Sequence, residues 1–261
     1  TLNENITYVK VLDSPASLGY IACNFYDNPS EKLKLVGITG TNGKSTTTAL
    51  IAHILSCVHF DFQYGGNIGV PVLDLPRNAK GYVLELSSFQ LDLLDQFNPD
   101  ISVLINITPD HLDRYATFDD YYKSKTRAFE GDGIKVIGID SEKSKRLFDT
   151  LKQAGDKKLI PLSTSVNIKN GITCHESTIH DNYFNEIKYE IGFLKNLQGK
   201  HNSENIAAAF AVCRSLGLKA QEIIDHVTTF PGLKHRMQYI GTKGKFSFYN
   251  DSKATNAAAA A

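Results

Sequence analysis

The sequence lacks the features that mark secreted, membrane-bound and polyanion-binding proteins. Its four cysteines, Cys23, Cys57, Cys174 and Cys213, form no C-x-x-C pair, so we expect reduced core thiols rather than a disulfide framework or a zinc site. Lysine plus arginine equals aspartate plus glutamate at 28 each, which leaves no electrostatic footprint for nucleic acid or an anionic membrane. No run of about 18 apolar residues and no signal-peptide pattern occurs. We therefore expect a cytoplasmic protein without nucleic-acid or membrane partners.

Apolar strand-like runs alternate with helical patterns along most of the chain. The 261 residues, 42% apolar and 21% charged, are those of one large or two modest globular domains. Alternation of this kind predicts a parallel sheet covered by helices. The expected strands are 33–38, 82–86, 101–107, 134–139, 159–162 and 245–249, and the expected helices begin near 44 or span 141–154, 201–216 and 220–230.

The predicted fold class is α/β: a mostly parallel sheet flanked by helices, with a phosphate loop. Residues 171–192 differ from the rest, because threonine, tyrosine and isoleucine are scattered there among charged residues without a helical period. This pattern predicts a small antiparallel β appendage.

A glycine-rich segment, Gly-Thr-Asn-Gly-Lys-Ser-Thr, separates the first expected strand from the first helix. Small residues let backbone N–H groups turn toward phosphate oxygens, the lysine supplies positive charge, and the next hydroxyl can ligate Mg²⁺. The generic pattern has a glycine where this chain has Ile38, so Gly40 is expected to make the early turn. No guanine-reading Asn-Lys-x-Asp occurs, which favours ATP over GTP. The expected ligands are Gly40, Thr41, Asn42, Gly43, Lys44, Ser45 and Thr46.

Two polar clusters follow later strands, where the ligands of parallel sheets collect. Glu85 lies near the end of an apolar strand, either paired or metal-bound or, as an equal alternative, at a solvated strand end. His111, in Asp-His-Leu-Asp-Arg-Tyr, is either a structural histidine or a ligand for metal or phosphate. Lys125 lies on an expected helix, whose charges by default form a solvated face.

Seven motifs, in this order, resemble those of the Mur ligases. They are GTNGKS at 40–45, GGNIG at 65–69, ELSSFQL at 85–91, DHLDRY at 110–115, GKHNSEN at 199–205, HR at 235–236 and NDSKATN at 250–256. The third and the last have the forms typical of the D-glutamate-adding members. The resemblance runs from about residue 36 to the end.

This resemblance implies an ATP-dependent amide ligase of peptidoglycan synthesis, with ATP and Mg²⁺ as cofactors. Its substrates would be D-glutamate and UDP-N-acetylmuramoyl-L-alanine, joined through an acyl phosphate, and the protein would be a monomer. The implied catalytic residues are Lys44, Glu85, His111 and Lys125. For the metals, the resemblance implies Mg²⁺ on Ser45 and Glu85 and a second metal on His111 and a carbamylated Lys125. For the nucleotide, it implies that adenine lies near Asn202 and Asn205 and that Arg236 and Asp251 contact the γ-phosphate and the ribose. For the other substrates, it implies a contact at Asn67 and places the amino acid near Lys253 and Thr255.

The domain expectation divides the chain into three parts. Residues 1–35 form an atypical segment that looks like the approach to the phosphate loop in the diaminopimelate- or lysine-adding sister ligase. Residues 36–243 form a central ATP-binding domain, and 244–261 begin a missing C-terminal domain. From these divisions we expect nucleotide binding with negligible ligation by the 261-residue chain alone.

Alternative functions stay open at this point. One is a non-catalytic or partner-dependent nucleotide-binding module. Another is a different amide ligase, either the diaminopimelate- or lysine-adding sister or folylpolyglutamate synthase. Phe89 speaks against the sister, and Asn67, expected to contact a UDP substrate, speaks against the folate enzyme.

Overall fold

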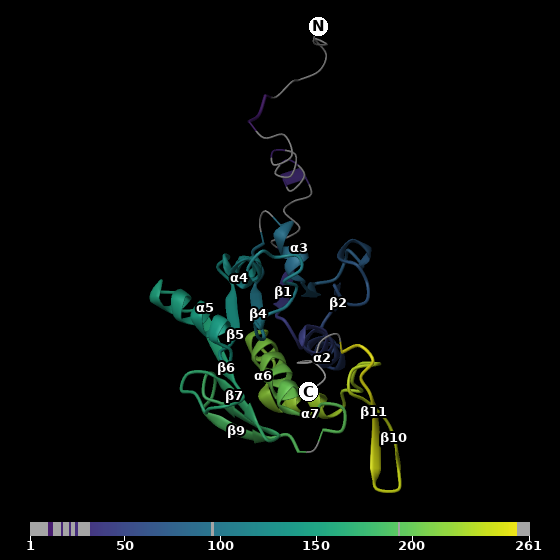
Figure 1. The fold of residues 1–261 in the computed structure, drawn as a ribbon. Helices are drawn as coiled ribbons and strands as arrows, with labels where there is room; N and C mark the ends of the chain where they lie inside the picture. Colours follow the sequence, from purple (N-terminus) through teal and green to yellow (C-terminus); the bar gives the residue numbers. More distant parts are fainter. Residues whose placement is uncertain are drawn as a thin grey trace.

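The structure is a computed structural model that describes residues 10–12, 17, 21, 24–25, 32–94, 97–192 and 194–254. Its centre is a nine-stranded sheet with the order β2-β3-β1-β4-β5-β6-β7-β8-β9 (Figure 1). The first seven strands in this order, from β2 at the edge to β7, pair in parallel. Strands β8 and β9 then extend the sheet with antiparallel pairing. The strands are β1 (Lys34–Thr39), β2 (Phe62–Gly66), β3 (Gly81–Glu85), β4 (Ile101–Leu104), β5 (Ile134–Gly138), β6 (Leu159–Ser163), β7 (Ile172–His175), β8 (Thr178–Asp181) and β9 (Ile187–Glu190).

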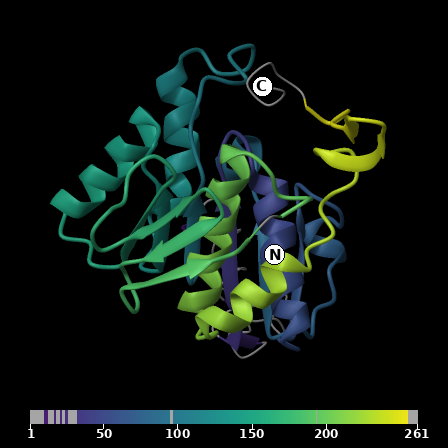
Figure 2. The same cartoon turned by 90° about the horizontal axis from the view of Figure 1, so that it is seen from below.

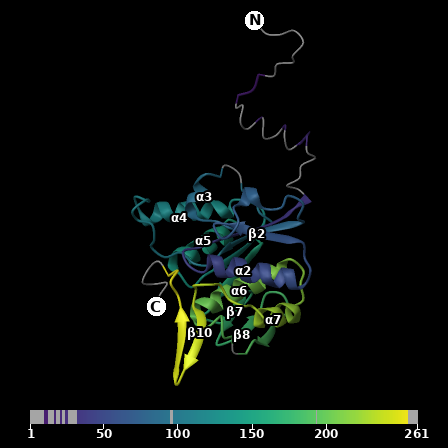
Figure 3. The ribbon, with the colours of Figure 1, turned by 90° about the vertical axis from the view of Figure 1, so that its right-hand side faces the viewer.

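Helices cover both faces of this sheet, which gives three layers (Figure 3). One face carries α2 (Lys44–Cys57), α6 (Lys200–Ser215) and α7 (Ala220–Thr228). The opposite face carries α3 (Ser88–Asp92), α4 (Phe118–Thr126) and α5 (Glu142–Gln153), with short 3₁₀ turns at η2 (Val72–Asp74) and η3 (Arg127–Phe129). The predicted α/β class is therefore confirmed.

Burial on both faces explains why the central strands are almost wholly apolar. Successive side chains of a strand point to opposite faces, so Val36 and Ile38 enter the core beneath α2 and α6 while Leu35 packs on the other side. Helix α6 contributes a run of fully buried alanines, and such small side chains bring it close to the sheet and to α2. Figure 2 shows α6 crossing the middle of the molecule beside α2.

The β elements at the edges differ from expectation in three ways. The antiparallel patch predicted at 171–192 exists as β7–β9, but it continues the main sheet through the parallel β6–β7 pair. A separate two-stranded antiparallel sheet is formed instead by β10 (Gln238–Lys243) and β11 (Phe246–Asn250), which projects as a hairpin in Figure 1. Of these two strands only β11 was predicted, and β2 was not predicted either.

Strand order brings the expected site residues to one edge. β1 lies between β3 and β4, so their carboxyl ends are neighbours. Ligands of parallel sheets bind beyond these ends. Within the described ranges, no helix is long and apolar enough to span a membrane.

Candidate nucleotide site

The phosphate loop leaves β1 and enters α2 through two glycines with positive φ. Gly40 has φ +153°, and Gly43, which caps α2, has φ +85°. A side chain on Gly43 would be strained, and its Cβ would lie 2.3 Å from Asn205 Oδ1. Because the first N–H groups of a helix have no partner within it, the start of α2 presents donors for an anion. The chain bends at residues 41–43, directly after Gly40, and the role of Gly40 in the early turn stays a prediction.

The first half of the loop, Thr41 and Asn42, is hydrogen-bonded to the segment that follows β4. The backbone N–H of Thr41 donates to Asn106 O at 2.9 Å, and that of Asn42 donates to Asn106 Oδ1 at 3.0 Å. Thr41 Oγ1 donates to Thr108 O and accepts from Thr108 N–H, at 3.1 and 3.0 Å. The N–H groups of Thr41 and Asn42 are therefore already occupied, which leaves those at the start of α2 for phosphate.

Lys44 folds back over the loop. Its Nζ donates to Gly40 O at 3.0 Å and to Thr41 O at 2.9 Å. Burial lowers the pKa of Lys44, whereas the nearby Glu85 carboxylate acts in the opposite direction and Arg236 adds to the lowering. A bound polyanion would offset the repulsion between the Lys44 and Arg236 side chains.

Glu85 is 1% exposed at the end of β3. Its Oε1 accepts a hydrogen bond from Asn67 Nδ2 at 2.9 Å, and Asn67 N–H donates to Glu85 O at 2.9 Å. Its Oε2 is buried and has no hydrogen-bond partner among the described residues. A buried unpaired carboxylate oxygen is costly, so this atom is suited to a cation ligand. Of the two alternatives for Glu85, the structure therefore favours a buried, hydrogen-bonded carboxylate over one at a solvated strand end.

Lys125 is also 1% exposed, at the end of α4, so the default solvated position is wrong. Its Nζ donates to Thr39 Oγ1 at 3.3 Å and lies 4.8 Å from the centroid of the Tyr121 ring. Burial lowers the pKa of Lys125 well below its usual value, and Lys44 adds to this effect. A neutral amine is a nucleophile, which is what carbamylation requires.

His111 lies at the mouth of the site, with a positive φ of +53°. Its side chain is 46% exposed; Nε2 lies 3.8 Å from Asp110 Oδ2. The ring centroid is 4.9 Å from that of Phe89 and 6.1 Å from that of Tyr121. His111 and Lys125 therefore share Tyr121 as a neighbour. Across the described ranges, no cluster of three or more His, Cys, Asp or Glu side chains could hold a metal.

The remaining predicted residues lie around a pocket between the phosphate loop and the first turn of α6. Asn205 is fully buried: its Oδ1 accepts from Thr47 Oγ1 at 3.0 Å and its Nδ2 donates to Asn202 Oδ1 at 2.9 Å. Arg236 Nη2 donates to Ser45 Oγ at 3.4 Å. The pocket is lined by Asn42, Gly43, Thr46, Asn196, His201, Asn202, Asn205, Leu233, Arg236, Met237 and Asp251.

The C-terminal part of the predicted set is only partly described. Asp251 Oδ1 accepts from Met237 N–H at 3.0 Å, which closes the base of the β10–β11 hairpin beside the pocket. Lys253 N–H donates to His235 O at 3.1 Å, and the Lys253 side chain is exposed. Thr255 lies outside the described residues. The ligand roles of these three residues stay predictions.

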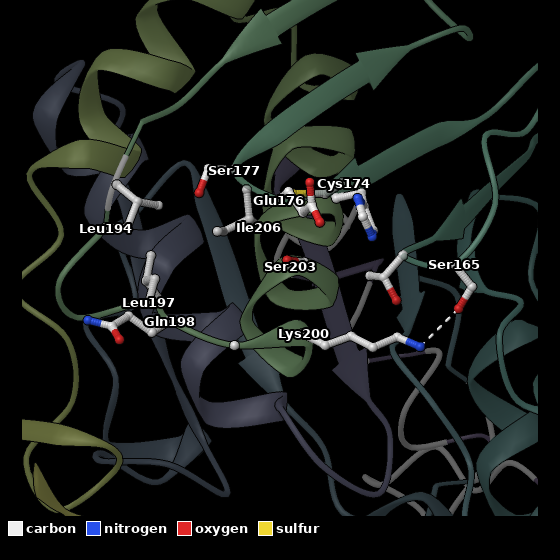
Figure 4. Close-up of a pocket in the computed structure, with 13 residues that line it drawn as sticks. Ser165, Cys174, Glu176, Ser177, Leu194, Leu197, Gln198, Lys200, Ser203 and Ile206 are labelled. Atoms are coloured by element: carbon white, nitrogen blue, oxygen red, sulfur yellow. Dashed lines mark hydrogen bonds between the residues drawn. The ribbon is translucent and has the colours of Figure 1, made fainter.

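A second pocket, shown in Figure 4, is lined by Lys200, Ser203 and Ile206 of α6, whereas His201, Asn202 and Asn205 line the first pocket. Lys200 donates to Ser165 Oγ at 2.9 Å, and Ser203 and Cys174 form part of the wall. None of the predicted site residues lines it. Residues of the first turn of α6 therefore line both pockets.

Three polar residues of the site are not among the predicted ligands. Asn106 holds the loop, Glu204 accepts from Asn106 Nδ2 at 2.8 Å, and Tyr121 contacts Thr41 Oγ1 at 3.2 Å through its hydroxyl group. Asn106 is a polar residue within the apolar run predicted as strand 101–107, two residues after β4 ends, which is a usable signal. Glu204 and Tyr121 lie on helices, and although Glu204 falls within the motif at 199–205, nothing in the local sequence of either residue indicates its contact.

Comparison with known proteins identifies the family. Residues 38–213 match the Mur ligase middle domain. The chain belongs to the Mur ligase family. UDP-N-acetylmuramoylalanine--D-glutamate ligase from Rickettsia prowazekii (strain Madrid E) is 50% identical over 234 residues, covering 88% of this chain and 52% of that protein. The protein of the same name from Rhizobium meliloti (strain 1021) is 44% identical over 230 residues, covering 87% and 50%. The resemblance inferred from the motifs is confirmed.

Solved Mur ligases share the fold. A UDP-N-acetylmuramoyl-L-alanyl-D-glutamate--2,6-diaminopimelate ligase superposes with a TM-score of 0.69 at 23% identity, over 85% of this chain and 51% of that one. MurF from Acinetobacter baumannii gives 0.66 at 20% identity, over 96% and 57%. This Mur ligase chain spans about half the length of the curated relatives it matches, 52% and 50% for the two named above.

Proposed function

We propose that this chain is the ATP-binding core of a cytoplasmic Mur ligase that joins D-glutamate to UDP-N-acetylmuramoyl-L-alanine in peptidoglycan synthesis. The names of relatives that are 44% and 50% identical support this choice of substrates. The acceptor carboxylate would attack the γ-phosphorus of ATP, and the amino group of D-glutamate would then attack the acyl phosphate. Residues 36–243 would form the ATP-binding domain, 1–35 an atypical segment and 244–261 the start of a further domain, in a monomer.

One observation carries the proposal: two lysines and a glutamate lie together beside the start of α2, whose first N–H groups have no partner within the helix. Lys44 and Lys125 both lie near Glu85, whose Oε2 has no partner among the described residues. Attack of an oxyanion on a phosphate requires that charge on both be neutralised, and fixed cations in a site with little water do this efficiently. Lys44 would exchange its two carbonyl partners for phosphate oxygens, and Arg236 would approach the same phosphates from the Ser45 side.

The donor set also fits Mg²⁺. Ser45 Oγ and Glu85 Oε2 are hard oxygen ligands of the kind that Mg²⁺ prefers, and Asn67 fixes the Glu85 carboxylate through Oε1. The ion, when bound, would supply charge neutralisation for the phosphates. For a second metal, His111 and a carbamylated Lys125 would be the ligands, and the burial of Lys125 favours the neutral amine that carbamylation needs.

The first test measures Mg-ATP binding by thermal unfolding. At an ATP concentration of about a hundred times Kd, binding should stabilise the chain by roughly 2.7 kcal/mol. Lys44→Ala should abolish the shift, and Glu85→Gln should remove its dependence on Mg²⁺. Lys34→Ala is the matched control, because Lys34 lies at the other end of β1 and pairs with Asp100. An absent shift, or one kept in Lys44→Ala, would refute the site.

The second test concerns substrates and uses the protein as expressed from its gene. With ATP, Mg²⁺ and UDP-N-acetylmuramoyl-L-alanine, we expect a D-glutamate adduct and none with meso-diaminopimelate or L-lysine. A parallel assay supplies UDP-N-acetylmuramoyl-L-alanyl-D-glutamate as the acceptor, and an adduct with meso-diaminopimelate or L-lysine there would identify the sister activity instead. Nucleotide binding without any adduct would favour the non-catalytic module.

A further inference from the structure

Asn106 occupies an unusual position beneath the phosphate loop, because its backbone and side chain hold consecutive N–H groups. Asn106 O accepts from Thr41 N–H at 2.9 Å, and Asn106 Oδ1 accepts from Asn42 N–H at 3.0 Å. These two bonds occupy the backbone N–H groups of the first half of the loop. The next N–H groups, from Gly43 onward, are consequently the ones that face an incoming anion.

The orientation of the Asn106 amide is set by Glu204. A backbone N–H can only donate, so Asn106 must present Oδ1 to Asn42 and Nδ2 to the opposite side. There Nδ2 meets Glu204 Oε2 at 2.8 Å, across 98 residues of sequence. A carboxylate only accepts, so it excludes the flipped amide, which would place two oxygens together. Glu204 thereby holds Asn106 in the one orientation that serves the loop.

Helix α6 supports the second half of the loop through the residue that follows Glu204. Asn205 Oδ1 accepts from Thr47 Oγ1 at 3.0 Å and lies directly beneath Gly43. The loop thus rests on α6 at two successive residues, once through Asn106 and once directly. The N–H groups of Thr41 and Asn42 are used in these bonds, so the donors left for phosphate are those at the start of α2.

We propose that Asn106 and Glu204 are a positioning pair that shapes the phosphate loop for ATP without touching the nucleotide. The inference rests on the proposed ATP-binding function. Loss of either side chain should weaken binding of the triphosphate and leave contacts to the nucleoside unchanged, because the pair acts on the N–H groups that receive phosphate.

The test compares the affinities of the chain for Mg-ATP and for adenosine. Asn106→Ala should weaken Mg-ATP by about tenfold, the upper range for one backbone hydrogen bond, with adenosine within twofold of the parent. Glu204→Ala should act in the same direction. Asn98→Ala is the matched control, because Asn98 Oδ1 accepts from Asp132 N–H at 3.0 Å at the other end of β4. It should leave both affinities unchanged.

A charge-swapped pair gives a rescue that a merely structural role would not produce. Asn106→Asp places a second carboxylate against Glu204 and should weaken Mg-ATP more than Asn106→Ala does. Adding Glu204→Gln to Asn106→Asp restores a donor-acceptor pair, because the amide introduced on α6 can donate to the new carboxylate while the latter accepts from Asn42. The double variant should bind Mg-ATP within about threefold of the parent, and the two substitutions should therefore be strongly non-additive.

Three outcomes overturn the inference alone: Asn106→Ala binds Mg-ATP like the parent, adenosine weakens as much as Mg-ATP, or the double variant is no better than Asn106→Asp. A parent chain that fails to bind Mg-ATP at all refutes the proposed function instead. The two failures are therefore distinguishable from one set of titrations.

Discussion

At the residue scale, Asp140 shows how one side chain joins two strands beside the site. It follows β5, and its Oδ1 accepts from Ser163 Oγ at 2.6 Å while its Oδ2 accepts from Thr164 N–H and Oγ1, both at 2.7 Å. Burial alone would raise the pKa of Asp140, but these hydrogen bonds outweigh it and hold the pKa below its usual value. The folded state therefore favours the ionised carboxylate.

This lowered pKa predicts the acid sensitivity of the fold. The stabilisation is complete above the unfolded-state pKa of about 3.9 and is lost as pH falls through the lower folded-state pKa. Asp140→Asn should lower the free energy of unfolding by about 1–2 kcal/mol at neutral pH, with a smaller deficit in acid. Asp149→Asn, which breaks an exposed pair with Lys145, should stay within about 0.5 kcal/mol at every pH. Urea unfolding across the pH range measures both, and parallel curves for parent and Asp140→Asn would contradict the prediction.

At the scale of elements, the start of α2 is shaped by α6 as much as by its own sequence. Gly43 has the left-handed φ of +85°, and Asn205 of α6 fills the space where its side chain would be. Gly155, after α5, has nearly the same φ of +86° but open space around it. A side chain at Gly155 would therefore meet backbone strain alone, whereas one at Gly43 would meet backbone strain and a steric clash with Asn205.

Alanine at these two positions should give different results. Gly155→Ala should cost about 1 kcal/mol of stability, the strain of a left-handed residue, and leave ATP binding intact. Gly43→Ala adds the collision with Asn205, so it should cost at least about 2 kcal/mol and remove the Mg-ATP shift. Thermal unfolding with and without Mg-ATP measures both effects. Equal losses in the two variants would show that the collision is relieved without consequence.

Elements were predictable from sequence where burial dictated composition. β1, β3 and β5 are buried on both faces, so their apolar runs stand out, and α2 follows a local glycine-rich signal. β2 reads Phe-Gln-Tyr-Gly-Gly and is an edge strand, held by pairing with β3 rather than by its own composition. β10 is largely exposed, so its pattern resembles a loop.

The residues of the site also fall into those recognisable from the local sequence and those that depend on packing between distant segments. The phosphate loop is contiguous in sequence, so its position between β1 and α2 was predictable, and Glu85 could be suspected because a carboxylate is conspicuous inside an apolar strand. The Asn106–Glu204 contact joins residues 98 positions apart, and only the packing of α6 across the sheet brings them together. The burial of Lys125 likewise depends on a distant partner, Thr39 of β1, which the charged local sequence of α4 conceals.

At the scale of the whole molecule, two apolar cores lie on either side of the sheet, and α6 is central to the larger one. Phe210 is fully buried there, whereas Phe246 on the β10–β11 hairpin is 73% exposed. The same residue type thus occurs both at the centre of the fold and on an element that stands apart from it.

Truncation of each phenylalanine should therefore differ in effect. Phe210→Ala should lower the free energy of unfolding by about 3–5 kcal/mol through lost contacts and a cavity. Phe246→Ala should stay within about 0.5 kcal/mol, because its side chain is largely solvated. Urea unfolding followed by circular dichroism measures both. A large loss in Phe246→Ala would show that the hairpin belongs to the cooperative core.

The support of the phosphate loop by α6 also sets an order of events during protein synthesis. Thr47 and its partner Asn205 are 158 residues apart, so at about 5–20 residues per second roughly eight to thirty seconds pass between their synthesis on the ribosome. During this interval the nascent chain exposes the apolar face of α2 without its cover. The nucleotide can therefore stabilise the loop in its folded form only after α6 has been synthesised.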